Sequence, residues 1–88
     1  MTEQTVTIVN ALGLHARAAA RFVELAARFR SHIKVTRGAR TIDGKSILGL
    51  LLLAAARGMS ITISATGDDE QMAIDALAAL VARGFEES

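Results

Sequence analysis

The segment Gly13-Leu14-His15-Ala16-Arg17 places a histidine and an arginine two residues apart, a pair that can handle a phosphoryl group. Gly13 lets the chain turn after an extended segment, and an alanine-rich helical pattern begins at about Ala16. His15 should therefore lie at a helix N-terminus, where the first amides are unpaired and the helix dipole favours an anion. An imidazole there can accept a phosphoryl group, which Arg17 and the free amides can then hold. The pattern predicts a nucleophilic histidine.

Taken alone, His15 has a second interpretation, because a histidine near a helix start is more often a solvated loop residue. The other histidine, His32, falls in an alternating segment and is expected on the surface of a strand. No acidic residue lies at ligand spacing to either histidine and the chain has no cysteine, so we expect no metal site and no cofactor. The acidic run Asp68-Asp69-Glu70 is better explained as the start of a helix, with Asp68 as its cap.

A second notable segment is Gly44-Lys45-Ser46-Ile47-Leu48-Gly49-Leu50. Ser46 stands where an N-cap is expected, directly before the apolar run 47–56. A helix with four leucines in a row cannot bury them all, so some apolar side chains should be exposed and form a docking patch. The alternative is a helix sunk deeply in the core. The candidates for exposed positions are Ile47, Leu48, Leu51 and Leu52.

Length, composition and charge narrow the function classes. The 88 residues suffice for one domain, which we expect to span residues 1–88. A net charge of +1 and the absence of tyrosine and tryptophan disfavour a nucleic-acid-binding domain. The longest apolar run is too short to cross a bilayer, and Met1-Thr2-Glu3-Gln4 lacks the basic region of a secretory signal. We expect a cytoplasmic protein that binds no nucleic acid and does not insert into a membrane.

Hydrophobic periodicity predicts seven elements in the order βαββαβα. Alternating segments predict strands at 5–9, 32–37, 40–43 and 60–66. Helical spacing predicts helices at 16–28 or 16–29, at 47–56, and from Asp68 as cap to Gly84 as terminator. The short turns favour an antiparallel sheet with the helices packed on one face, an α+β fold. Residues 86–88 are expected to fray beyond the last helix.

Together, the two segments resemble the HPr family, the histidine-containing phosphocarriers of the bacterial phosphotransferase system. The segment around His15 resembles the active-site motif of that family, and the segment around Ser46 resembles its regulatory-serine segment at the expected distance. Length and element order fit too, so the resemblance covers essentially the whole chain. It implies an open-faced β-sandwich, with a four-stranded antiparallel sheet and three helices on one face.

The resemblance also implies a stoichiometric phosphoryl carrier rather than an enzyme. His15 would accept a phosphoryl group from enzyme I, itself charged by phosphoenolpyruvate, and pass it to an enzyme IIA-type protein. Arg17 would balance the charge of the transferred group, and Ser46 would be a target of a dedicated serine kinase/phosphorylase. The carrier is expected to be a monomer. The residues implied to contact partner proteins are Arg21, Ile47, Leu48 and Leu51.

Ala18 departs from the family pattern, because sugar-transport members commonly carry proline at this position. Alanine is compatible with the first turn of a helix, so phosphoryl transfer should survive the change. It also resembles nitrogen-related carriers, so a regulatory phosphocarrier is an alternative to a sugar-uptake carrier. A further alternative is a non-catalytic α+β regulatory binding module, against which His15 followed by Arg17 at a helix start argues.

Overall fold

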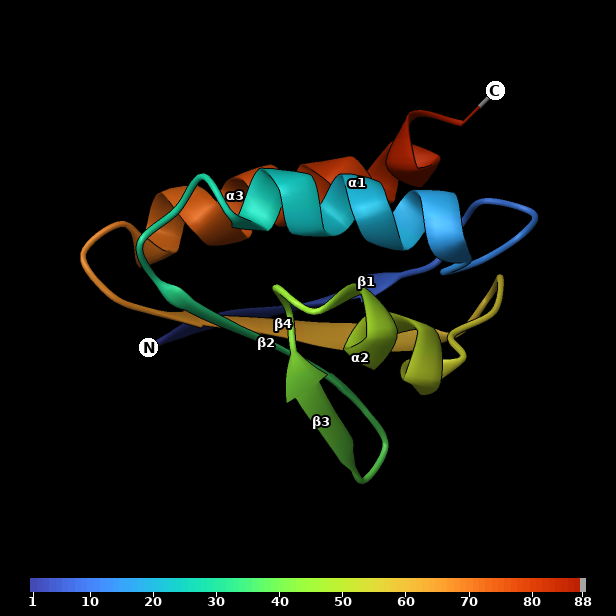
Figure 1. The fold of residues 1–88 in the computed structure, drawn as a ribbon, viewed down its shortest axis with the longest axis horizontal. Helices are drawn as coiled ribbons and strands as arrows, with labels where there is room; N and C mark the ends of the chain where they lie inside the picture. The colour runs from blue at the N-terminus through green and yellow to red at the C-terminus, as the bar shows by residue number, and fades with distance from the viewer. Residues whose placement is uncertain (88) are drawn as a thin grey trace.

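A computed structural model describes residues 1–87 and has the α+β fold that the sequence predicts. The elements are β1 (Thr2–Thr7), α1 (Ala16–Ala26), β2 (His32–Arg37), β3 (Arg40–Asp43), α2 (Ile47–Leu53), β4 (Ser60–Thr66), α3 (Glu70–Ala82) and the short 3-10 turn η1 (Gly84–Glu86). Four antiparallel strands form one sheet in the order β1-β4-β2-β3, and α1 and α3 lie side by side over one of its faces (Figure 1). Helix α2 contributes Leu50 and Leu53 to the same hydrophobic cluster, so the open-faced sandwich is confirmed.

The two faces of the sheet differ in chemistry because side chains alternate along each strand. On the covered face, the inward residues of β4 are fully or almost fully buried, as predicted, at Ile61, Ile63 and Ala65. The opposite face carries hydroxyl groups in a row that crosses all four strands, formed by Thr5, Thr62, Thr36 and Thr41. The hydroxyls pair within the row, with 2.9 Å between Thr5 and Thr62 and 2.9 Å between Thr36 and Thr41. This face can therefore remain open to water.

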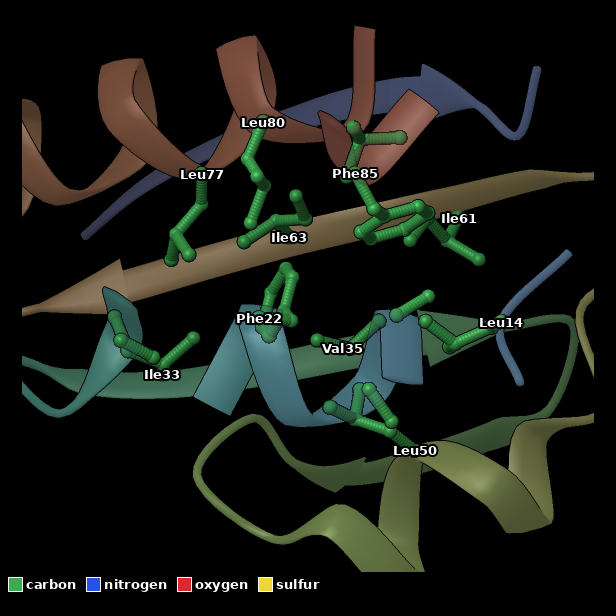
Figure 2. Packing of buried hydrophobic residues seen from close by; sticks show 14 of the residues in the cluster. Leu14, Phe22, Ile33, Val35, Leu50, Ile61, Ile63, Leu77, Leu80 and Phe85 are labelled. Carbon is green, nitrogen blue, oxygen red and sulfur yellow. The ribbon is translucent and has the colours of Figure 1, made fainter. Parts of the chain in front are cut away.

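One hydrophobic cluster lies between the helices and the covered face of the sheet (Figure 2). Phe22 of α1 stands at its centre and is completely buried. The predicted buried stripe of α3 is confirmed at Ala73, Leu77, Leu80 and Val81. Phe85, which lies beyond α3, is also completely buried in this cluster. The core therefore holds the chain after the last helix as well as the helices themselves.

Several element ends differ from the prediction. The first strand runs from Thr2 to Thr7 rather than over 5–9, although Ile8 is buried as expected. Helix α1 ends at Ala26, and the amides of Arg28 and Phe29 then bond to carbonyls three residues back, so the last turn tightens. Phe29 still packs against the core.

Helix α2 stops at Leu53 rather than at residue 56, because the next residue, Ala54, takes a left-handed conformation with φ of 51°. The turn brings the carbonyl of Ala55 to the amide of Leu14 at 2.9 Å. Guanidinium groups of the β2–β3 hairpin bond the last carbonyls of the helix, Arg37 to Leu53 at 2.7 Å and Arg40 to Leu52. Long-range contacts thus end α2 earlier than its apolar pattern predicts.

The start of α3 corrects the prediction that Asp68 caps this helix. The N-cap is Asp69, and its carboxylate makes no cap bond but accepts hydrogen bonds from Ser31 and from the amide of Arg30. The Ser31 hydroxyl and the Arg30 amide hold the pKa of Asp69 below its usual value. Asp69 therefore ties the α1–β2 connection to the start of α3.

Glu70 ties the N-terminus of the chain to the same helix. Its carboxylate accepts a hydrogen bond from the Thr2 hydroxyl at 2.5 Å and another from the Gly67 amide at 3.2 Å. It also lies 3.2 Å from the amino group of Met1. The Thr2 hydroxyl, the Gly67 amide and this amino group together lower the pKa of Glu70 to about 2.

The expectation that the C-terminal residues fray is wrong for residues 86 and 87. Glu86 belongs to η1, and the Glu87 carboxylate accepts a hydrogen bond from Asn10; Ser88 lies outside the described residues. No helix among residues 1–87 is long and apolar enough to cross a membrane.

We predict that Glu70→Gln lowers stability at neutral pH and has little effect in acid. The pKa of the Glu70 carboxyl is about 2 in the folded chain, whereas its ordinary value is 4.5. The ionised group therefore stabilises the fold fully above pH 4.5, and this contribution is lost as the pH falls toward 2. Melting temperatures of the two proteins, compared from neutral pH downward, should converge. Glu3→Gln, which changes an exposed carboxylate of β1, is the control. A gap between wild type and Glu70→Gln that stays constant with pH would contradict the assignment.

Candidate active site

The loop between β1 and α1 sets the position of His15. Gly13 has a positive φ of 66°, and a Cβ added there would lie 2.6 Å from the carbonyl oxygen of Ala55. Only glycine therefore fits this close approach of two backbone segments. Leu14 is buried and donates its amide to the same carbonyl at 2.9 Å. These contacts hold the residue before His15 on the connection that follows α2.

His15 is the N-cap of α1, and the helix begins at Ala16 as predicted. Its backbone is extended, its carbonyl accepts the Ala19 amide at 2.8 Å, and its Nδ1 accepts the Arg17 amide at 3.3 Å. The ring thus stands at the end of the helix where unpaired amides and the positive dipole end lie. Its side chain is 26% exposed, so it is neither a buried core residue nor a fully solvated loop residue.

The other ring nitrogen contacts the C-terminal tail, which the sequence analysis missed. Nε2 of His15 lies 2.6 Å from Oε2 of Glu87, a side chain that is only 17% exposed. The tail is held by Phe85, whose ring is buried and whose carbonyl accepts Nη1 of Arg21 at 2.5 Å. A phenylalanine just after the helix-ending Gly84 was the available sign that this segment packs rather than frays.

Asn10 joins the loop to the tail. Its Nδ2 donates to the Gly13 carbonyl at 2.8 Å and to Oε1 of Glu87 at 2.7 Å. Because both partners are acceptors, they fix which end of the amide faces them. The amide oxygen is buried without a hydrogen-bond partner among the described residues. Asn10 therefore positions the carboxylate that faces His15.

Opposing effects set the ionisation of Glu87. Burial alone raises the pKa of this carboxyl, but hydrogen bonds from Asn10 and His15 and the nearby charges of His15 and Arg21 outweigh it, so the pKa lies below its usual value. The group at Nε2 is thus an ionised carboxylate near neutral pH.

A hollow of about 520 Å³ borders the site, and three guanidinium groups and two carboxylates line it. Arg17, Arg21 and Arg57 share its wall with the β1–α1 loop and with Glu86 and Glu87 of the tail. Arg17 is exposed and Arg21 half-buried, so the structure brings both predicted arginines to the site of His15. Arg57 was not predicted as a site residue, because in the sequence it only follows the apolar run 47–56. Three guanidinium groups around one hollow suit an anion such as a phosphoryl group.

Helix α2 presents the other predicted site residues. The Ser46 hydroxyl accepts the Gly49 amide at 3.0 Å, which confirms the N-cap. Leu50 and Leu53 are buried, and α2 packs against α1. Both interpretations of this helix hold in part, since one side is core and the other remains exposed. The exposed side consists of Ile47, Leu48, Leu51 and Leu52, which we call the α2 patch.

The other histidine and the acidic residues are the remaining possible metal ligands. His32 is an exposed residue of β2, as predicted. Across residues 1–87 no three histidine, aspartate or glutamate side chains gather as metal ligands.

Comparisons with known proteins agree with this fold. The sequence model described as "PTS HPr component phosphorylation site" matches residues 2–83. Phosphocarrier protein HPr of Cupriavidus necator is 48% identical over 99% of this chain and 98% of its own length, and phosphocarrier protein NPr of Shewanella violacea is 43% identical over 98% and 94%. A crystal structure of HPr from Thermoanaerobacter tengcongensis superposes with a TM-score of 0.96 at 43% identity, covering 100% of this chain and 99% of that one. The chain therefore belongs to the HPr family of phosphocarrier proteins of the phosphotransferase system.

Proposed function

We propose that His15 accepts a phosphoryl group from phosphorylated enzyme I and passes it to a histidine of an enzyme IIA-type protein. The observation that carries this proposal is the partly exposed imidazole at the N-terminus of α1, beside a hollow lined by Arg17, Arg21 and Arg57. The ring supplies a nucleophile, and the helix amides and guanidinium groups supply positive charge for the group that arrives.

The nucleophile in this proposal is Nδ1, the nitrogen that faces the end of α1. Its only described partner is the Arg17 amide at 3.3 Å, a long bond that an incoming phosphoryl oxygen can take over. Arg17 is exposed and can swing toward the transferred group when a partner docks. A few amides and one mobile arginine stabilise the group moderately, as a carrier that must release it requires.

The α2 patch is proposed as the docking surface for these partners. Leu48 is 67% exposed, and its neighbours in the patch are exposed as well, although apolar side chains would be better buried in an isolated domain. A partner that covers the patch and surrounds His15 would exclude water from the transfer. Arg21 is proposed to assist through its place in the hollow.

Ser46 is proposed as a regulatory phosphorylation site at the start of α2. Its observed role is that of a cap, and a phosphate at a helix N-terminus is favoured locally. A phosphate there would nevertheless place two negative charges beside Ile47 and Leu48, where a partner has to dock. Modification should then weaken docking without unfolding the helix.

The protein that finally receives the phosphoryl group is proposed to belong either to a sugar-uptake system or to a nitrogen-related regulatory system. Relatives named HPr and NPr are similarly close to this chain, at 48% and 43% identity. Ala18 is completely buried in the first turn of α1, so it packs in the core and does not touch the transferred group. Transfer from the phosphorylated protein to IIA-type proteins of each branch, compared by rate, decides between the two.

We predict that His15→Ala folds normally and takes up no label from phosphoenolpyruvate in the presence of enzyme I. The side chain is partly exposed and removing it leaves the core intact, but the described residues that line the hollow include no second histidine. Labelling should be compared with wild type and with His32→Ala, which keeps His15, and the label should be acid-labile. Full labelling of His15→Ala would overturn the proposed function.

Arg17→Ala should slow phosphoryl acceptance by on the order of 10- to 100-fold, because one charge that stabilises the transferred group is lost. Its free energy of unfolding should stay within about 0.5 kcal/mol of wild type, since the side chain is exposed. Single-turnover labelling measures the rate, and Arg28→Ala, an exposed arginine just beyond α1, is the matched control. Equal rates for wild type and Arg17→Ala would remove Arg17 from the site.

Leu48→Glu should weaken binding to enzyme I at least roughly tenfold while leaving the circular dichroism spectrum unchanged, because a charge in a docking surface must be desolvated. The control is Met72→Glu, which puts the same charge on α3 at a side chain that is 68% exposed. Titration calorimetry measures both affinities. Equal losses in the two variants, or none in either, would show that the α2 patch is not the docking surface.

Ser46→Asp should keep its thermal stability, because aspartate is as good an N-cap as serine, yet bind enzyme I more weakly. Ser46→Ala separates the two roles: it should lose about 1 kcal/mol of stability and keep its affinity. The loss of affinity for enzyme I in Ser46→Asp should shrink at high salt, because salt screens long-range repulsion between charges. Wild-type affinity of Ser46→Asp at low salt would leave Ser46 with its cap role alone.

A further inference from the structure

We propose that Glu87 is a positioning residue that keeps the proton of the imidazole on Nε2 of His15 and so leaves the Nδ1 lone pair free for the phosphoryl group. The inference rests on the proposed function of His15. It concerns a tail residue that lies beyond the part of the chain matched by the family model.

The hydrogen bonds at the two ring nitrogens agree with one tautomer. An ionised carboxylate can only accept, so the 2.6 Å contact between Oε2 of Glu87 and Nε2 requires a proton on Nε2. In the neutral ring Nδ1 then carries the lone pair, and it is this nitrogen that accepts the Arg17 amide. The short contact is charge-assisted, whereas the bond at Nδ1 is long, so Glu87 is the partner that sets the tautomer.

The carboxylate is itself held from two sides. Nδ2 of Asn10 donates to Oε1 of Glu87 at 2.7 Å and also to the Gly13 carbonyl. If the amide turned over, its oxygen would face both of these acceptors, so the amide is fixed in this orientation. Phe85 anchors the backbone in the core, with help from Arg21. Phe85 and Glu86 adopt left-handed φ values of 57° and 63°, which non-glycine residues adopt only where the surroundings hold them there. The tail is thus built to deliver Glu87 to the ring.

The same contact supports the transfer step. As Nδ1 attacks, the Nδ1–P bond forms and the P–N bond of the donor phosphohistidine breaks, with its electron pair moving to the donor nitrogen. The proton stays on Nε2, so the ring gains positive charge, which the ionised Glu87 stabilises from the opposite edge. No further proton has to move. The neighbouring Arg17, Arg21 and Arg57 offset the combined negative charge of Glu87 and the phosphoryl group.

The test compares the tautomer of His15 in wild type and Glu87→Ala by long-range ¹H–¹⁵N correlation spectra, at a pH where titration shows the ring to be neutral. Wild type should hold a single Nε2–H tautomer, and Glu87→Ala should give a mixture. Phosphoryl acceptance from phosphorylated enzyme I should slow by roughly tenfold, the low end of the loss seen when a group that orients a metal-bound histidine is removed. Glu87→Gln can keep the hydrogen bond but not the charge. Compared with Glu87→Ala, it should therefore recover most of the Nε2–H tautomer but less of the rate of phosphoryl acceptance.

Asp75→Ala is the control, because it removes the same charge from an exposed position of α3 that does not line the hollow. It should leave tautomer and rate unchanged. An unchanged tautomer in both Glu87 variants, or equal changes in Asp75→Ala, would overturn the proposal. The spectra need no partner protein, so absence of phosphoryl acceptance by wild type would refute the proposed function while the tautomer still decides the role of Glu87.

Discussion

The hydrogen bonds on both ring nitrogens of His15 are the constraint on which the site depends. One nitrogen meets the amide end of α1, and the other meets a carboxylate from the end of the chain, 72 residues away in sequence. The first contact needs the tight approach of Gly13 to the segment after α2. The second needs Phe85 in the core. Loop, helix and tail thus meet at one imidazole, and each is held by packing that lies elsewhere.

The molecule has exposed surface of two kinds. The open face of the sheet carries a row of paired threonine hydroxyls and can stay in water without cost to apolar groups. The α2 patch is apolar and uncovered, next to the helix that carries His15. This contrast favours docking on the helix side of the molecule, where a partner can bury apolar surface and reach the imidazole in one step.

Local signals in the sequence predict most of the fold. Alternation defines His32–Arg37, Arg40–Asp43 and Ser60–Thr66, and capping chemistry predicts Ser46 as the start of α2. Features made by contacts between distant residues escape such signals. The end of α2 depends on arginines of a hairpin, and Asp69 binds the α1–β2 connection rather than capping its own helix. Likewise, the sequence predicts His15 and Arg17 but not Glu87, because the tail reaches the ring only through tertiary packing.

The position of the phosphoryl group on the ring tests the account most directly. Wild type can be labelled with ¹⁵N, phosphorylated by enzyme I and phosphoenolpyruvate, and examined by ¹⁵N–³¹P coupling and ¹⁵N chemical shifts. Because Glu87 holds the proton on Nε2 and the Arg17 amide faces Nδ1, we expect phosphorus on Nδ1 of His15 and a proton retained on Nε2. Phosphorus bound to Nε2 would contradict the account, since that nitrogen faces a carboxylate in the structure described above.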